Sequence, residues 1–193
     1  VERDNDTGDQ EGSRLTARTV DPEQYGRFLI EIFDEWVRHD VGTMFVSMFD
    51  GVLMSYLRGY SSLCVLQPRC GENVALEHNG DLYSCDHYVE PAYLLGNIVY
   101  TPIAQMVGSP KQLAFGAAKG DALPVQCREC EFLFTCHGEC PKNRVLKTSD
   151  GEPGLNWLCD GLKKFFQHTH RPMRLMADLM QRGRYADEVM ESF

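Results

Sequence analysis

The chain has 193 residues, 43% of them hydrophobic, and a formal net charge of −9. A chain of this length buries roughly 70% of the surface that its unfolded form exposes, so it supports a hydrophobic core. The acidic balance argues against binding to nucleic acid or to an anionic membrane surface, and no apolar run reaches the roughly 18 residues that span a membrane. The first residues, Val1 to Asp4, match neither a signal peptide nor a translation start, so we expect further sequence upstream.

The first predicted helix follows a polar segment, Glu2 to Arg18, which we expect to be a loop. Asp21 precedes a proline and an acidic residue, the pattern of a capped helix start. Apolar residues then recur at helical spacing: Tyr25, Phe28, Leu29, Ile32, Phe33, Trp36 and Val37. This spacing predicts an amphipathic helix that Gly42 ends.

The next segment combines a short apolar run with a second helix. Residues Met44 to Phe49 predict a strand covered on both faces. Asp50 is expected to cap a helix that continues to Leu57 and ends near Gly59. The order helix, buried strand, helix is typical of the end of an α/β layered or barrel domain, and one such unit cannot close a parallel sheet.

A different architecture begins at Cys64. Residues 73–78 and 81–85 flank Asn79-Gly80, the strongest short signal for a β-hairpin with a two-residue turn. Residues 127–140 are too dense in Cys, Gly and Pro for a regular element, which predicts a ligand loop. Further helices are expected over residues 102–107, 110–119, 155–168 and 172–182.

Eight cysteines occupy this second part of the chain: Cys64, Cys70, Cys85, Cys127, Cys130, Cys136, Cys140 and Cys159. Without a secretory signal, and with an ordinary hydrophobic share, metal-binding thiolates are favoured over a disulfide framework. The spacing is C-x5-C-x14-C, then C-x2-C-x5-C-x3-C and a last cysteine after eighteen more residues. A 4Fe-4S cluster takes four thiolates, so the eight cysteines supply two full sets.

The spacing also suggests which cysteines share a cluster. The compact run provides local ligands, and in two-cluster ferredoxins the last cysteine of such a run ligates the other cluster. By that logic the first auxiliary cluster is held by Cys64, Cys70, Cys85 and Cys140. The second is held by Cys127, Cys130, Cys136 and Cys159. Two structural zinc sites with four cysteines each are the alternative, because a C-x2-C pair serves zinc equally well.

The cysteine pattern resembles the signature of SPASM domains. Cys70, nine residues, Gly80, four residues and Cys85 match its first half, and the run from Cys127 to Cys140 followed by Cys159 matches its second half. SPASM domains are carboxyl-terminal extensions of radical S-adenosylmethionine enzymes that act on peptides and proteins. Within that group the chain is similar to the anaerobic sulfatase-maturating enzymes. The features that it shares with them are Cys64, Cys85-Asp86, residues 95–98 (LGNI), residues 155–159 (LNWLC) and residues 33–37 (FDEWV).

The resemblance implies an α+β fold with two parts. Residues 1–60 would be the end of a partial (β/α) radical-SAM barrel. Residues 61–193 would be a SPASM domain, a β-hairpin and short helices around two 4Fe-4S clusters, with carboxyl-terminal helices. The implied partners are a sulfatase polypeptide and an electron donor such as a ferredoxin or flavodoxin, with no nucleic acid and no membrane, in the cytoplasm.

The resemblance also implies an activity, the oxidation of a Ser or Cys of a sulfatase to formylglycine. Asp86 matches the family's general base, and a carboxylate beside a negatively charged cluster should have a raised pKa; the alternative is that Asp86 caps a turn. The CxxxCxxC loop for a third cluster and S-adenosylmethionine is absent from these residues, so we expect it upstream and expect the chain alone to be inactive. Two other functions remain open: the SPASM region of a different peptide maturase, and a non-catalytic two-zinc binding module.

Overall fold

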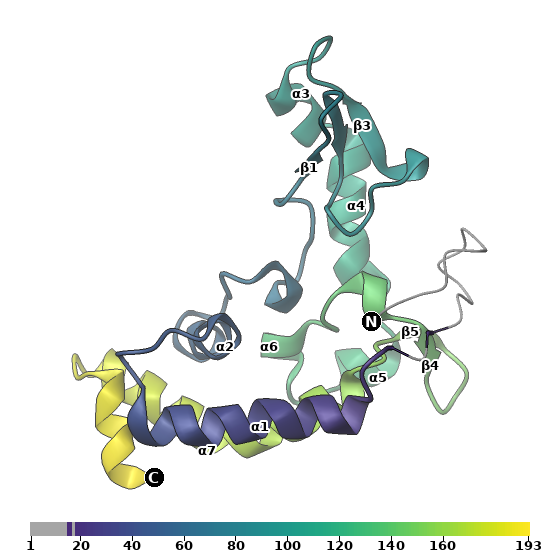
Figure 1. Cartoon of the computed structure of the whole chain (residues 1–193). Helices are drawn as coiled ribbons and strands as arrows, with labels where there is room; N and C mark the ends of the chain where they lie inside the picture. The colour runs from purple at the N-terminus through teal and green to yellow at the C-terminus, as the bar shows by residue number, and fades with distance from the viewer. Residues whose placement is uncertain (1–14, 17) are drawn as a thin grey trace. The chain divides into compact units, whose positions relative to one another are not determined.

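The computed structural model describes residues 15, 16 and 18–193, so the segment predicted as a loop over residues 2–18 lies almost wholly outside the described residues. The chain divides into two compact units, Val1–Gln67 with Pro124–Phe193, and Pro68–Leu123. Helices and small sheets combine in an α+β architecture, as predicted (Figure 1). The predicted domain boundary between residues 60 and 61 stays a prediction. In the described part, no helix has the length and apolar character needed to cross a membrane.

The first helix, α1 (Pro22–His39), confirms the prediction for this segment. Asp21 caps it, and its Oδ1 accepts hydrogen bonds from the backbone N–H groups of Glu23 at 2.9 Å and Gln24 at 3.0 Å. One face of the helix is buried in the core: Gly26, Leu29, Phe33, Trp36 and Val37. The helix ends at His39 with Asp40 as its C-terminal cap, shortly before Gly42, whose φ of 81° favours glycine.

The predicted buried strand over residues 44–49 is wrong, because helix α2 (Ser47–Arg58) begins inside it. Met44 and Phe45 are 56% and 79% exposed, whereas Phe49 and Val52 are fully buried three residues apart on one helical face. A six-residue apolar run does not distinguish a strand from a buried helix, and the tertiary packing decides. The expected end at Gly59 is confirmed by its left-handed backbone, φ 73°.

The two closing helices predicted after residue 155 are a single helix, α7 (Cys159–Gln181), which continues through Pro172. Proline removes one backbone hydrogen bond and normally kinks or ends a helix. Here Pro172 is buried, and its neighbours Met173 and Met176 are fully buried in the core. Burial of this apolar face stabilises the continuous helix.

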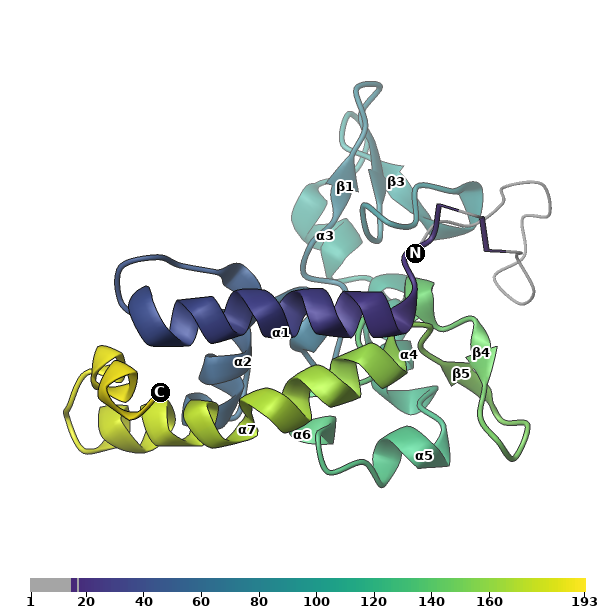
Figure 2. The same ribbon diagram turned by 60° about the horizontal axis from the view of Figure 1, so that its bottom comes forward.

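The core of the first unit lies between α1, α2 and α7, and Figure 2 shows α1 and α7 side by side. Phe33 lies 5.2 Å from Phe49 and 6.2 Å from Phe165, measured between ring centroids. The helices approach closely where Gly161 meets α1, since a Cβ there would lie 1.9 Å from the Pro22 carbonyl oxygen. Any side chain at Gly161 would separate the two helices.

The second unit contains a three-stranded antiparallel sheet in the order β1 (Ala75–Leu76), β2 (Asp81–Tyr83) and β3 (Leu94–Asn97). The predicted hairpin is confirmed as β1 and β2, with Leu76 opposite Leu82. The third strand was not predicted. Helices α3 (Ile103–Val107) and α4 (Pro110–Asp121) confirm the two helices predicted for this region.

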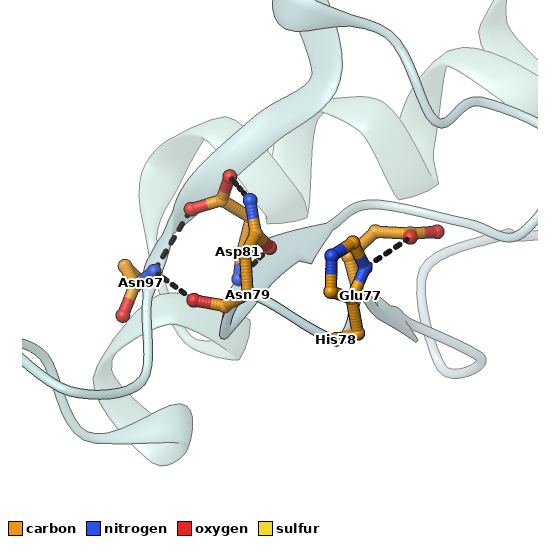
Figure 3. A network of polar contacts seen from close by, with 5 residues as sticks. All are labelled: Glu77, His78, Asn79, Asp81 and Asn97. Atoms are coloured by element: carbon orange, nitrogen blue, oxygen red, sulfur yellow. Dashed lines mark hydrogen bonds and ion pairs between the residues drawn. The ribbon is translucent and has the colours of Figure 1, made fainter.

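The hairpin turn differs from the predicted two-residue type. Gly80 N–H donates to the Glu77 carbonyl at 2.9 Å, Glu77 N–H donates to the Asp81 carbonyl at 2.9 Å, and Gly80 has φ 90°. This is a three-residue connection with glycine in the left-handed position. Asn97 of β3 fixes it, since its Nδ2 donates to the Asn79 carbonyl and to Asp81 Oδ1, both at 3.0 Å (Figure 3).

The predicted ligand loop over residues 127–140 contains more regular structure than expected. Two one-turn helices, α5 (Val125–Arg128) and α6 (Leu133–Cys136), lie in or at the edge of it. A small hairpin that was not predicted follows, β4 (Leu146–Lys147) with β5 (Pro153–Leu155). The remaining elements are short 3-10 helices: η2 (Cys64–Leu66), η3 (Pro91–Tyr93), η4 (Pro141–Asn143) and η5 (Ala186–Ser192).

Candidate metal centres

All eight cysteines lie in the described part of the chain, and none of them forms a disulfide bond there. Three helices of the first unit carry cysteines of the predicted second ligand set: α5 contains Cys127, α6 ends at Cys136 and α7 begins at Cys159. Cys130 lies between α5 and α6, and its N–H donates to the Cys127 carbonyl at 3.2 Å. The four thiols of this set therefore come from three helix ends and one turn of the same unit.

Three of these four thiols have raised pKa values. Burial is the main cause, and the pKa of Cys136 is raised to about 12, that of Cys159 to about 11, and that of Cys127 is also raised. Neighbouring thiolates contribute to these pKa values: Cys159 and Cys127 act on Cys136, and Cys127 and Cys130 act on Cys159. Mutual repulsion between buried thiolates is what a metal or cluster relieves when it replaces their protons. The donor set therefore fits a cysteine-ligated centre.

The loop from Cys136 to Cys140 is held by Arg144. Its guanidinium donates to the carbonyl oxygens of His137 at 2.9 Å, Gly138 at 3.1 Å and Glu139 at 3.4 Å. The backbone N–H of Gly138 forms a hydrogen bond to the Cys136 sulfur, which partly offsets the raised pKa of that thiol. Arg144 thus fixes the segment that connects two predicted ligands.

A second polar group, Asn156, ties the same loop to the start of α7. Its Nδ2 donates to the Glu139 carboxylate at 2.7 Å, to the Gly138 carbonyl at 3.3 Å and to the Cys140 carbonyl at 3.5 Å. Its Oδ1 accepts from the Leu158 N–H at 2.8 Å, one residue before Cys159. Glu139 and Asn156 are buried, so these bonds are shielded from water.

The predicted first set draws on both units. Cys64 and Cys140 belong to the first unit, where Cys64 is exposed in η2 and Cys140 is buried. Cys70 and Cys85 belong to the second unit, one before β1 and the other after β2. The assignment of these four cysteines to one cluster stays a prediction.

Within the second unit, α4 supports the backbone beside Cys70 and Cys85. Gln112 is buried, and its Nε2 donates to the Gly71 carbonyl at 2.9 Å and to the Ser84 carbonyl at 3.1 Å. Among the described residues, its Oε1 has no hydrogen-bond partner. The Gln112 side chain therefore bridges the residue after Cys70 and the residue before Cys85.

Asp86 lies beside Cys85, as the sequence requires. The Cys85 thiol donates to Asp86 Oδ1 at 3.2 Å, and this bond lowers the pKa of the Asp86 carboxyl below its ordinary value. A Cys85 thiolate bound to a cluster has no proton to donate, so the raised pKa expected for the cluster-bound form stays a prediction. Ligand atoms of Cys85, Asp86 and His87 lie within 4.8 Å of one another, the one such metal-type group found among the described residues.

The sequence reasoning missed the supporting residues Arg144, Asn156, Glu139 and Gln112. Arg144, Asn156 and Glu139 each lie within four residues of a predicted ligand cysteine, and this closeness along the chain is the one local signal that could have indicated their supporting role. Gln112 lies far from any cysteine along the chain, and only the fold brings it to the loops that it bridges.

Known proteins with similar sequences identify the class of protein to which the chain belongs. The family model of SPASM, an iron–sulfur cluster-binding domain, matches residues 64–131, so the chain contains this domain. A serine-type anaerobic sulfatase-maturating enzyme of Bacteroides thetaiotaomicron is 49% identical over 82% of this chain and 38% of its own length. A cysteine-type anaerobic sulfatase-maturating enzyme of Clostridium perfringens is 30% identical over 78% of this chain and 41% of its own length.

Solved structures agree with these relatives. A structure described as native anSMEcpe with bound AdoMet and Cp18Cys peptide matches with a TM-score of 0.75 and 27% identity, over 88% of this chain and 47% of that chain. The chain corresponds to the carboxyl-terminal portion of the anaerobic sulfatase-maturating enzymes, as its resemblance predicted. It spans about two fifths of the length of the curated relatives that it matches.

Proposed function

We propose that the chain is the auxiliary-cluster region of an enzyme that oxidises a Ser or Cys of a sulfatase to formylglycine by radical S-adenosylmethionine chemistry. The observation that carries the proposal is the 49% identity to a serine-type sulfatase-maturating enzyme of a chain with a SPASM match and with four cysteines of the predicted second set in one compact unit. A sulfatase polypeptide is the substrate in this proposal, and a cytoplasmic ferredoxin or flavodoxin is the electron donor.

We propose that two 4Fe-4S clusters bind here with the predicted ligands. Cys64, Cys70, Cys85 and Cys140 would hold the first, and Cys127, Cys130, Cys136 and Cys159 the second. A bound cluster supplies one-electron chemistry over a wide range of potentials. The residues of this chain supply the thiolates, the buried loop that carries them and a carboxylate beside one of them.

Asp86 is the proposed general base. Oxidation of the substrate side chain removes a hydrogen atom from its carbon, a proton from its hydroxyl or thiol, and one further electron, which gives the aldehyde from Ser and a thioaldehyde from Cys that water hydrolyses to the aldehyde with release of hydrogen sulfide. The Asp86 carboxylate next to Cys85 would accept that proton if the substrate binds near the first cluster, and its hydrogen bond to the Cys85 thiol supports this assignment. S-adenosylmethionine and its own 4Fe-4S cluster would be bound by sequence upstream of these residues, so the isolated chain is expected to produce no 5′-deoxyadenosine from S-adenosylmethionine and a reductant.

Anaerobic reconstitution tests the proposal directly. The chain should take up about eight irons and show broad absorbance near 400 nm, because two 4Fe-4S clusters contain that amount of iron and absorb in that region. A Cys130→Ser variant is the matched test of the second set, and it should lose iron while the wild-type chain retains it. A colourless, folded protein with two zinc ions and no iron would contradict the proposal and favour a two-zinc binding module.

A further inference from the structure

The loop between Cys136 and Cys140 has a backbone that needs outside support. Its inner residues His137, Gly138 and Glu139 have φ values of 46°, 70° and 52°. A residue other than glycine in this left-handed region is strained and persists only where surrounding structure holds it. His137 and Glu139 both have this conformation, on either side of Gly138, so contacts from elsewhere in the fold must stabilise the loop.

Those contacts act mainly on carbonyl oxygens, and one joins Asn156 to the Glu139 carboxylate at 2.7 Å. Arg144 donates to three of them, at His137, Gly138 and Glu139, and Asn156 donates to two, at Gly138 and Cys140. The backbone N–H groups of His137 and Glu139 donate to the carbonyl oxygens of Leu133 at 3.0 Å and Cys136 at 2.8 Å. The Gly138 N–H between them forms a hydrogen bond to the Cys136 sulfur, a predicted ligand.

We propose that Arg144 is a positioning residue for the cluster held by Cys127, Cys130, Cys136 and Cys159, an inference that rests on the proposed function. Its guanidinium holds the carbonyls of His137, Gly138 and Glu139 and thereby keeps the Gly138 N–H on the Cys136 sulfur. N–H dipoles that face cluster sulfurs stabilise the reduced, more negative form, and carbonyl dipoles do the opposite. Arg144 therefore raises the reduction potential of this cluster.

The arginine fork is required for this role. A guanidinium presents divergent N–H donors in a rigid plane, whereas a lysine ammonium is a point charge. The positive charge of Arg144 also acts on Cys127, whose pKa it lowers against the effect of burial. Charge and hydrogen-bonding geometry are thus separate properties of Arg144, and a lysine variant distinguishes them.

The experiment measures iron content and reduction potentials of the anaerobically reconstituted chain by a redox titration followed by electron paramagnetic resonance. The variants are Arg144→Gln, Arg144→Lys and Arg182→Gln. Arg182 is exposed at the end of α7, so Arg182→Gln is a control that removes one positive charge away from the loop. Arg144→Gln should make the reduction potential of one cluster more negative by about 59 mV, which corresponds to a tenfold change in a one-electron reduction equilibrium. Arg144→Lys should shift it in the same direction, and Arg182→Gln should change neither potential.

The outcomes separate the alternatives. If Arg144→Gln keeps the wild-type iron content and unchanged reduction potentials, the inference is overturned. If Arg144→Lys has the wild-type potential, the charge of residue 144 explains the effect and the positioning role is overturned. If Arg144→Gln fails to fold, Asn156→Ser decides, because it removes the donor to the Gly138 and Cys140 carbonyls while Arg144 remains. A smaller shift in the same direction supports positioning, and no shift overturns it. A wild-type chain that takes up no iron overturns the proposed function itself.

Discussion

Gly116 of α4 lies directly against the backbone of Cys70. A Cβ at residue 116 would lie 2.5 Å from the Cys70 carbonyl oxygen, and the Cys70 N–H donates to the Gly116 carbonyl at 3.1 Å. The helix and the ligand segment are therefore in contact through main-chain atoms, and the position of Cys70 depends on the absence of a side chain in α4.

Gly116→Ala should destabilise the second unit by about 1–3 kcal/mol, because the added methyl group forces the Cys70 segment away from α4. The measurement is chemical unfolding of the metal-free chain, together with iron content after reconstitution. Gly120→Ala is the matched control in the same helix, where the added Cβ would lie 3.2 Å from the Pro68 carbonyl oxygen and needs a smaller adjustment. Equal effects of the two substitutions would contradict the role assigned to Gly116.

Gln112→Met should also weaken the second unit. The substitution keeps the side-chain volume but leaves the carbonyls of Gly71 and Ser84 without their buried donor, at a cost of about 1–3 kcal/mol. Iron uptake should fall from about eight toward about four per chain, since one of two 4Fe-4S clusters loses its framework. Gln105→Met on exposed α3 is the control and should retain both stability and iron. Full iron uptake by Gln112→Met would show that the bridge is dispensable.

Asp86→Asn tests the proposed base in the full-length enzyme. An amide cannot accept the substrate proton, so formylglycine formation on a sulfatase peptide should fall by at least about a hundredfold, within the range for loss of a general base. Iron content should stay at the wild-type level, because Asp86 is not among the proposed ligands. Asp150→Asn, in the exposed turn between β4 and β5, is the control. Retained activity in Asp86→Asn would exclude this role.

The metal-free chain should lose stability at alkaline pH. The pKa of Cys136 is about 12 in the folded chain against an ordinary value of 9.0, so between these values the unfolded state binds fewer protons than the folded state. The stability contribution is therefore complete below pH 9.0 and is lost as the pH rises toward about 12. One such thiol lowers the free energy of unfolding by up to about 1.4 kcal/mol per pH unit.

Chemical unfolding under reducing conditions at several pH values above 8 measures this slope. Cys136→Ser has no thiol to ionise at this position and should show a shallower decline than the wild-type chain. Identical slopes in the two proteins would mean that the Cys136 thiol titrates normally in the folded state.

Local signals in the sequence predicted the features that depend on neighbouring residues. Asp21 and the apolar spacing after it predicted α1, because a cap and an amphipathic face are properties of one short segment. Gly80 predicted a hairpin, although the turn has three residues rather than two. The cysteine pattern resembles the SPASM signature, and the family match over residues 64–131 confirms that resemblance, because cluster ligands recur at fixed spacing along the chain.

The tertiary structure decided the features that depend on distant residues. The run at residues 44–49 became the start of a helix because Phe49 packs against Phe33 and Phe165, and α7 continues through Pro172 because that face is buried. Arg144, Asn156 and Gln112 form hydrogen bonds to backbone carbonyls. Every residue has a backbone carbonyl, so the sequence does not mark which one accepts a given hydrogen bond. Which side chain reaches which carbonyl is therefore set by how the chain packs, and only the folded structure shows it.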